Sequence, residues 1–286
     1  MTDKKQYYFS KFQDAIFVIK MGGEVIFDDE KLLRLLQDIA TLHEHGIKII
    51  LVHGGGPQAD TLSRSLGFEP VKVEGRRVTS EQDIEVVQML YGGKLNLRII
   101  SLFRKLGVKA MRVSGMDAQL LDVVKRPVGE VDYGLVGDIV QVNPEILYDL
   151  LGANIVPVVS PLAASEDGEI LNINADTIAA HLAEKIMADK LIYFTNTDGV
   201  LNDQGERYPF LVPEEVTELT AKGVINGGMK VKTQNGLQAL QGGVKRVHIL
   251  NGLHEHSLLL EVVTTEGSGT MLCTAAERDE HLKELS

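Results

Sequence analysis

Apolar and polar positions along the chain alternate between two periods. Short apolar runs rich in β-branched residues predict buried strands at 15–20, 47–53, 108–114, 155–160, 190–195 and 246–251. Amphipathic stretches between them predict helices over 29–45, 57–66, 79–105 and 175–188, after Pro144, over 229–241 and, as the last helix, near 254–263. Strands and helices that alternate in this way predict a mainly parallel sheet covered by helices on both faces.

Polar and glycine residues mark the ends of these elements. Asp28 or Asp29 is expected to cap the first of these helices, which Gly46 ends, and Thr79 or Ser80 is expected to start the long one. The rhythm breaks over residues 119–142, where glycines between apolar runs predict a hairpin.

Composition narrows the class of protein. The 286 residues are 44% hydrophobic and 24% charged, which is typical of a globular protein, and the net charge of −11 argues against a general nucleic-acid or anionic-membrane surface. The single cysteine, Cys273, excludes a disulfide framework within this chain and predicts a packing role in a reducing compartment. Neither a signal peptide at residues 1–5 nor an apolar run of membrane-spanning length is present, so we expect a cytoplasmic protein.

Two glycine clusters follow the first two predicted strands. Lys20 precedes Gly22 and Gly23, and Gly54–Gly56 precede the helix that starts near Pro57. Glycine lets backbone N–H groups approach a bound anion, and a helix start adds partial positive charge. Tight strand-to-helix turns are the alternative, but these need about one glycine each. Because ligands of parallel sheets bind beyond the carboxyl ends of the strands, the clusters predict an anion site there.

Two further constellations carry polar groups. Asn172, Asn174 and Asp176 alternate into a helix, so their side chains are expected to point together into a cleft; helix capping is the alternative and uses one of the three. Gly227–Gly228 precede a helix with Lys230 and Lys232 in its early turns, where solvated surface lysines are the alternative.

Four further residues have both a functional and a structural interpretation. Arg76 and Arg77 precede a predicted helix, and an arginine fork suits a carboxylate, although most surface arginines hold nothing specific. His53 and His181 lack metal-ligand companions at suitable spacing and are expected to be structural.

Motifs of several enzyme classes are absent from the sequence. Neither a Walker A loop nor the dinucleotide G-x-G-x-x-G occurs, and no Ser/His/Asp pattern or activated cysteine stands out. A carboxylate nucleophile, with a pKa of about 4.3, is already ionised at neutral pH. Phosphoryl transfer to such a group needs positioning and charge neutralisation rather than a general base.

Eight motifs together resemble the amino acid kinase superfamily, and within it the N-acetylglutamate kinases. In order they are IKMGGEV, LVHGGGPQAD, GRRVT, YGLVGDIVQVNPEIL, NINADT, FTNTDGVL, NGGMKVK and EGSGTML, spanning about residues 16–272. The resemblance implies a three-layer αβα sandwich with two lobes. Residues 1–180 would bind the acyl amino acid and form the dimer, and residues 181–286 would bind ATP, with Mg²⁺ held through the phosphates and no metal ligand supplied by the protein.

The resemblance also implies roles for individual residues. Lys20 would steady the transferring phosphoryl group, Lys232 would lie on the leaving-phosphate side, and Asp176 would hold both lysines in position. Backbone N–H groups near the phosphoryl oxygens would come from Gly22, Gly23 and Gly55. The acyl-amino-acid site would consist of Gly55, Gly56, Arg77, Asn172 and Asn174, and the Arg77 guanidinium would bind the α-carboxylate. The nucleotide would be bordered by Thr195, Asn196, Asp198, Gly199, Val200, Gly228, Met229 and Lys230.

The activity implied is ATP-dependent phosphorylation of the side-chain carboxylate of N-acetyl-L-glutamate, a step of arginine biosynthesis. Two alternatives stay open: a kinase for an N-acylated or carrier-linked aminoadipate, and a non-catalytic amino-acid sensor on the same fold. A nicotinamide-dependent oxidoreductase is disfavoured by the missing fingerprint. We expect a homodimer, with a hexamer as the larger option, because QYYFSKF (6–12) and EGSGTM (266–271) resemble parts of the arginine-inhibited members.

Overall fold

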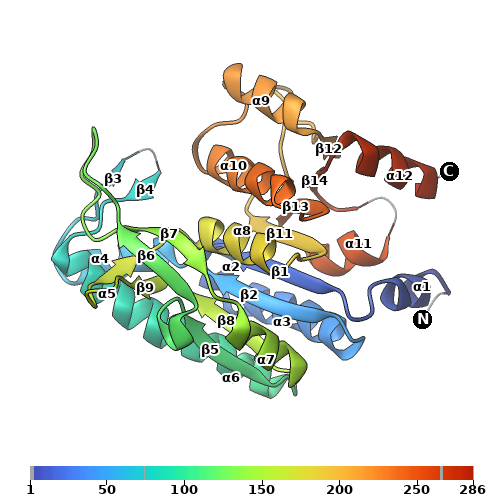
Figure 1. Cartoon of the computed structure of the whole chain (residues 1–286). Helices are drawn as coiled ribbons and strands as arrows, with labels where there is room; N and C mark the ends of the chain where they lie inside the picture. The colour runs from blue at the N-terminus through green and yellow to red at the C-terminus, as the bar shows by residue number, and fades with distance from the viewer. Residues whose placement is uncertain (1–2, 74, 265–266, 286) are drawn as a thin grey trace.

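The computed structural model describes residues 3–73, 75–264 and 267–285, which build an eight-stranded sheet (Figure 1). Its strand order is β12–β14–β13–β11–β1–β2–β8–β5. The strands are β1 (Ile16–Met21), β2 (Lys48–His53), β5 (Ala110–Ser114), β8 (Val156–Ser160), β11 (Lys190–Thr195), β12 (Phe210–Leu211), β13 (Arg246–Asn251) and β14 (Thr270–Leu272). Neighbouring strands run parallel except for β13 and β14, which are antiparallel. The mainly parallel sheet expected from the sequence is confirmed.

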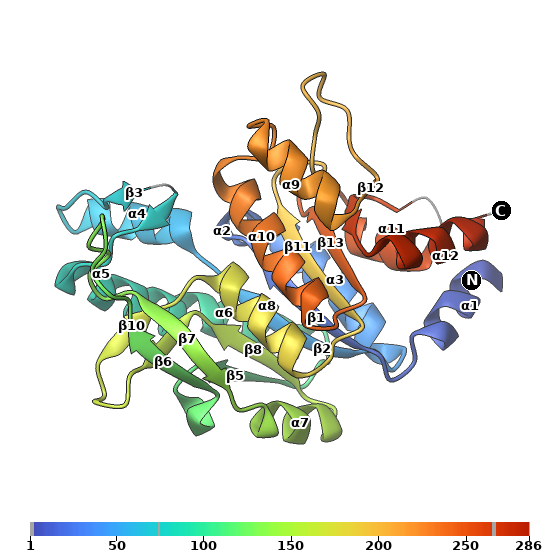
Figure 2. The same ribbon diagram turned by 45° about the horizontal axis from the view of Figure 1, so that its top comes forward.

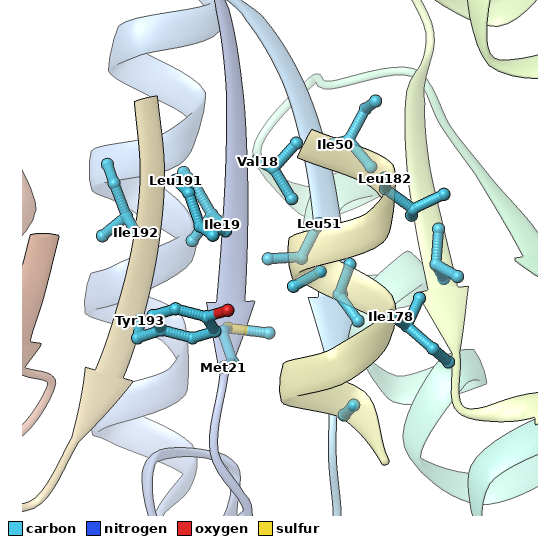
Figure 3. Packing of buried hydrophobic residues seen from close by; sticks show 14 of the residues in the cluster. Val18, Ile19, Met21, Ile50, Leu51, Ile178, Leu182, Leu191, Ile192 and Tyr193 are labelled. Carbon is cyan, nitrogen blue, oxygen red and sulfur yellow. The ribbon is translucent and has the colours of Figure 1, made fainter. Parts of the chain in front are cut away.

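Helices cover both faces of this sheet. One face carries α2 (Gly23–Phe27), α3 (Asp29–Glu44), α6 (Asn96–Lys105) and α11 (Ser257–Val263); the other carries α7 (Glu145–Gly152), α8 (Ala175–Lys185) and α10 (Gly227–Gln241). Figure 3 shows Ile178 and Leu182 on α8, which lies over β1 and β2 and buries both residues in the same cluster as Val18 and Ile50. Because both faces are covered, the central strands are apolar along nearly their whole length.

The predicted helix boundaries find physical causes in the structure. Asp28, rather than Asp29, caps α3: its Oδ1 accepts from the N–H groups of Glu30 at 2.9 Å and Lys31 at 3.1 Å. Ser80 caps the next long helix through a reciprocal capping box with Asp83.

That long helix differs from its prediction as a single element. It consists of α5 (Glu81–Val87), a π-helical segment (Gln88–Leu95) and α6 in continuous succession. Wide π turns often occur at functional sites. Here the π segment brings Tyr91 and Leu95 against Gly55, at the end of the strand–glycine motif.

Within the described part of the chain, three small antiparallel hairpins flank the sheet. The predicted hairpin over 119–142 is confirmed as β6 (Leu121–Lys125) paired with β7 (Gly137–Val142), and η2 (Asp117–Gln119) precedes it. The sequence did not reveal β3 (Lys72–Val73) with β4 (Arg76–Arg77), or β9 (Leu162–Ala164) with β10 (Ile170–Asn172). These strands are two or three residues long, too short for a period to register.

Several helices lie outside the predicted set. The structure adds α1 (Asp3–Lys11), α9 (Pro213–Ala221) and α12 (Ala275–Leu285). The helix predicted near 254–263 is confirmed as α11, but it is not the last one, because α12 follows it. The predicted helix from Pro57 is α4 (Gly56–Ser65). Figures 1 and 2 both place α1 and α12 at the same end of the molecule, where α1 packs against α11.

The division into two lobes at residue 180 stays a prediction. That position lies within α8, and the sheet runs without interruption from strands of the first half to strands of the second. In the part of the chain that the structure describes, no helix has both the length and the apolar character needed to cross a membrane.

Candidate active site

A cleft of about 610 Å³ opens where several parallel strands end. Lys20 of β1, the glycines after β2, and Thr195 at the end of β11 line it. Three helices, α4, α8 and α10, begin at its wall, at Gly56, Ala175 and Gly227. Helix N-termini present free N–H groups and partial positive charge, so the local backbone already suits an anion.

Two lysines from separate elements share one carboxylate in this cleft. Lys20 Nζ lies 2.8 Å from Asp176 Oδ1, and Lys232 Nζ lies 3.1 Å from Asp176 Oδ2. The side chains are 8%, 14% and 8% exposed for Lys20, Lys232 and Asp176. Asp176 stands in the first turn of α8, which packs beside α10, and α8 also lies over β1. The fold therefore assembles the three predicted residues into a triad.

Burial and mutual charge set the protonation of this triad. Burial by itself raises the pKa of Asp176, but the charges of Lys20 and Lys232 outweigh it and lower that pKa from 3.8 to about 2. Burial lowers the pKa of Lys20. The negative charge of Asp176 opposes this lowering, and the positive charge of Lys232 adds to it. Asp176 is therefore ionised at neutral pH and offers one oxygen to each ammonium group.

The two asparagines beside the triad, Asn172 and Asn174, make different hydrogen bonds. Asn174 caps α8, with Oδ1 accepting from the N–H groups of Asp176 at 2.9 Å and Thr177 at 3.1 Å. Asn172 Nδ2 donates instead to Thr79 Oγ1 at 3.1 Å. Capping thus accounts for only one of the three polar residues in this motif, Asn174. Asn172 and Asp176 also line the cleft, but neither of them caps the helix.

The space available for a side chain differs from one glycine of the two clusters to the next. A Cβ on Gly23 would lie 2.5 Å from Pro57 Cδ, and one on Gly55 would lie 2.5 Å from Leu95 Cδ1. A Cβ on Gly56 would meet nothing within 4 Å. Gly22, which also lines the cleft, would allow a Cβ at 3.4 Å from the Phe194 carbonyl oxygen. Gly23 and Gly55 are therefore required by packing, whereas Gly56 leaves open space.

Arg77 lines the cleft, but its guanidinium is already engaged. Nη1 donates to Asp83 Oδ1 at 3.1 Å, and Nη2 donates to the Gly56 carbonyl oxygen at 3.3 Å and to Asp60 Oδ1. Lys72 Nζ lies 2.6 Å from the other oxygen of Asp60. The Arg77 side chain is 7% exposed, so this is a largely buried network.

The predicted nucleotide residues fall into two groups. Thr195, Asn196, Gly228 and Met229 line the cleft; Asp198, Gly199, Val200 and Lys230 do not. Asp198 instead accepts from Asn251 Nδ2 at 2.8 Å, and the Val200 N–H donates to Thr270 Oγ1 at 2.9 Å. Gly199 has φ +98 and lies against Thr270, and Lys230 is exposed on α10. The nucleotide role of this second group stays a prediction.

Sequence reasoning missed several residues that line the cleft. They include Lys72, Tyr91 and Arg126 on one side and Asn226 on the other. Arg126 is held by Asp138, its Nε donating to both carboxylate oxygens at 3.1 and 3.2 Å. Arg126 and Asp138 both lie within the predicted hairpin, but neither a period nor a motif marks such a pair.

The remaining single residues behave as structural groups. His53 is fully buried, and burial lowers its pKa from 6.5 to about 4. Burial also lowers the pKa of His181, and Cys273 is buried. Within 3–73, 75–264 and 267–285 no cluster of three or more His, Cys, Asp or Glu residues is arranged to hold a metal ion.

The two regions tied to regulation by resemblance lie together. Tyr8 and Phe12, from QYYFSKF, line a small cavity of about 40 Å³ with Gly267 and Gly269 of the EGSGTM stretch. Glu266 of that stretch lies outside the described residues. A regulatory role for this region stays a prediction.

Comparison with known sequences identifies relatives over nearly the whole chain. The Amino acid kinase family matches residues 15–251. An acetylglutamate kinase of Aquifex aeolicus is 41% identical over 277 residues, covering 92% of this chain and 93% of that one. An acetylglutamate kinase of Desulfitobacterium hafniense is 42% identical over 276 residues, with the same coverage of 92% and 93%.

Solved structures agree in fold. The N-acetylglutamate synthase of Neisseria gonorrhoeae, complexed with coenzyme A and N-acetyl-glutamate, matches with a TM-score of 0.87 and 26% identity over 95% of this chain. The match covers 62% of the synthase, so this chain spans less than two thirds of that protein. An isopentenyl phosphate kinase matches with a TM-score of 0.63 and 17% identity, covering 90% of this chain and 99% of that one, which shows a shared fold.

The resemblance inferred from the motifs is confirmed by these matches. The family match from residue 15 to residue 251 includes the strand bearing Lys20, the helix bearing Asp176 and the helix bearing Lys232. The chain therefore belongs to the amino acid kinase family.

Proposed function

We propose that the protein phosphorylates the side-chain carboxylate of N-acetyl-L-glutamate with ATP and forms N-acetyl-L-glutamyl 5-phosphate, a step of arginine biosynthesis. The observation that carries the proposal is the shared carboxylate: Asp176 holds Lys20 at 2.8 Å and Lys232 at 3.1 Å inside the cleft. Relatives named acetylglutamate kinase, about 40% identical over more than nine tenths of the chain, support the choice of substrate.

The charge of the cleft suits two mutually repelling ligands. Of the residues that the structure describes, six cationic side chains line it against two acidic ones, although the whole chain carries a net charge of −11. The cations are Lys20, Lys72, Arg76, Arg77, Arg126 and Lys232, and the acids are Glu24 and Asp176. N-acetyl-L-glutamate and ATP are both anions, so a local excess of positive charge is needed for both to bind at once.

The reaction follows from positions rather than from proton transfer. The attacking carboxylate is ionised at neutral pH and needs no general base. In this proposal Lys20 and Lys232 neutralise the phosphoryl group as it moves, and Asp176 keeps both ammonium groups in place before the ligands arrive. Backbone N–H groups of Gly22, Gly23 and Gly55 contribute further donors. Such preorganised donors commonly supply about 3 kcal/mol each to the transition state.

Each half of the cleft takes one ligand in this proposal. The acyl amino acid contacts Gly55, Gly56, Arg77, Asn172 and Asn174, on the side built by residues 1–180. The nucleotide contacts Thr195, Asn196, Gly228 and Met229, on the side built by residues 181–286. In this proposal Asp198, Gly199 and Val200 shape the loop behind it, and Lys230 extends from α10 near the same side. Mg²⁺ would be held through the phosphates and supply charge neutralisation there.

Two alternatives receive less support. A non-catalytic sensor would have no need to keep both lysines and Asp176 together, and this chain keeps them in ion-pair contact. An aminoadipate kinase would use the same triad, so only the substrate distinguishes it. We further propose a homodimer in the cytoplasm; light scattering with and without arginine measures the assembly state, and a monomer in both would contradict the dimer.

Trapping the acyl phosphate tests the proposed function. The protein with ATP and Mg²⁺ is offered N-acetyl-L-glutamate, N-acetyl-aminoadipate and free glutamate, and hydroxylamine converts any acyl phosphate to a coloured hydroxamate. We expect hydroxamate with N-acetyl-L-glutamate and little with the other two. The same amount from N-acetyl-aminoadipate would favour the rival kinase, and none from any substrate would support the sensor.

A further inference from the structure

Arg77, which would bind the α-carboxylate of the substrate, already uses the N–H donors of Nη2 that such binding requires. Both Nη2 hydrogens of Arg77 have acceptors, the Gly56 carbonyl oxygen at 3.3 Å and Asp60 Oδ1. Nη1 has one acceptor, Asp83 Oδ1 at 3.1 Å. Because an Nη group carries two hydrogens, and counting bonds to the described residues, only Nη1 and Nε keep one each for a new ligand.

A two-pronged grip on a carboxylate requires Nη2. A guanidinium forms two parallel N–H bonds to a carboxylate either through Nη1 and Nη2 or through Nε and Nη2. Either arrangement needs an Nη2 hydrogen that now points to Asp60 or to the Gly56 carbonyl oxygen. Of these two acceptors, Asp60 carries the charge and its side chain is the one that can rotate.

A second cation, Lys72, already forms an ion pair with Asp60. Lys72 Nζ lies 2.6 Å from Asp60 Oδ2. Lys72 and Arg77 face each other across the β3–β4 hairpin, so their side chains emerge on the same side and reach the same carboxylate. The Asp60 side chain is 14% exposed and that of Lys72 is 43% exposed, which leaves this end of the network room to adjust.

Together these contacts describe an exchange of partners. We propose that Asp60 acts as a competing counter-ion that releases Arg77 when the acyl amino acid binds and remains paired with Lys72 alone. The inference rests on the proposed function, since the incoming group is the α-carboxylate of an N-acyl amino acid. Asp83 keeps hold of Nη1 and the capping box of α5, so Arg77 does not lose its position during the exchange. Asp60 and Lys72 are thus positioning residues that tune the affinity for the acyl amino acid.

A double-mutant cycle tests the exchange. Lys72→Met leaves Asp60 with Arg77 as its sole cation, so we expect the KM for N-acetyl-L-glutamate to rise about threefold, the scale of one partly exposed ion pair. The KM for ATP and kcat should change little. Asp60→Asn weakens the competitor and should lower the same KM or leave it unchanged. In the Asp60→Asn background, Lys72→Met should have no further effect.

Lys222→Met serves as the control for the loss of a lysine charge. It removes an exposed lysine that pairs with Glu218 on α9 and should change none of these constants. A rise in KM with Asp60→Asn overturns the inference, because Asp60 would then assist binding. An undiminished Lys72→Met effect in the double variant also overturns it, because Lys72 would contact the substrate itself.

Failure of the proposed function is distinguishable from failure of the exchange. A wild-type chain that forms no hydroxamate overturns both, whereas an active wild type with an additive cycle overturns the exchange alone. If a variant does not fold, a crystal structure of the wild type with N-acetyl-L-glutamate decides instead. We expect Arg77 Nη2 on the ligand carboxylate and Asp60 on Lys72 only; an Asp60–Arg77 bond retained beside the ligand would overturn the exchange.

Discussion

Replacing Asp176 by asparagine tests the centre of the site most directly. The amide keeps the shape of the side chain but removes the negative charge that lies 2.8 Å from Lys20 and 3.1 Å from Lys232. Two largely buried ammonium groups then face each other without a counter-ion. Removing one partner of a buried ion pair is destabilising because the remaining charge stays desolvated.

The size of the effect follows from the pKa of Asp176. Folding lowers that pKa from 3.8 to about 2. At about 1.4 kcal/mol per pH unit, the ionised carboxylate therefore contributes about 2 kcal/mol to the free energy of unfolding. We expect Asp176→Asn to lower Tm at pH 7 by about 4–8 °C. We also expect kcat to fall about a hundredfold, because the lysines lose their fixed positions.

The pH dependence has a definite sign. A carboxyl group whose pKa is lower in the folded state stabilises the fold above its unfolded pKa and loses that contribution as pH falls through the folded pKa. The difference in unfolding free energy between wild type and Asp176→Asn should thus have the same size at pH 7 as at pH 5. It should shrink between about pH 4 and about pH 2.

Urea unfolding followed by circular dichroism measures this difference, and the hydroxamate assay measures kcat. The matched control is Asp138→Asn, since Asp138 also pairs with a cation, Arg126, but its side chain is 43% exposed. That variant should lose less than about 1 kcal/mol. An Asp176→Asn protein as stable as wild type at pH 7 would refute the reasoning about the buried triad.

Three further predictions concern the walls of the cleft. Lys232→Ala should lower kcat about a hundredfold, roughly 3 kcal/mol, in the hydroxamate assay, and near-normal turnover would remove Lys232 from the mechanism. Arg77→Ala should raise the KM for N-acetyl-L-glutamate and leave the KM for ATP nearly unchanged; a selective ATP defect would mean that the two halves of the cleft are assigned in reverse. Gly55→Ala would place its Cβ 2.7 Å from Tyr91 Cε1 and should cost about 1–3 kcal/mol in urea unfolding, whereas Gly56→Ala, with no atom within 4 Å of its Cβ, should unfold like wild type.

Most of the central fold was predictable from local patterns. The strands β1, β2, β11 and β13 are apolar because helices cover both faces of the sheet, and runs of that kind are visible without any alignment. The cap at Asp28 and the hairpin of β6 and β7 were equally local, since the bonds that define them join residues close in sequence. The helices α1 and α12 were missed because they are predominantly polar, and α9 was missed because it buries little besides Val216.

In the candidate site, too, some residues could be identified from local motifs and others could not. Lys20, Asp176 and Lys232 could be selected because each sits in a motif that resembles the family, and the structure brings them together. No local signal announced Arg126, which reaches the cleft from a hairpin. The outward placement of Asp198 and Lys230 was likewise invisible, because it depends on how loops and α10 pack.

By itself, then, the sequence determined the order of the six longer strands of the sheet and of most helices that cover them, the family, and which residue types are available for phosphoryl transfer. Tertiary structure alone decided which charges meet: one aspartate shared by two lysines, and Arg77 divided between Asp60 and Asp83. The physical reason is that periodicity and capping depend on neighbours along the chain. Ion pairs depend instead on distances through space and on burial, which exist only once the sheet and its helices have packed.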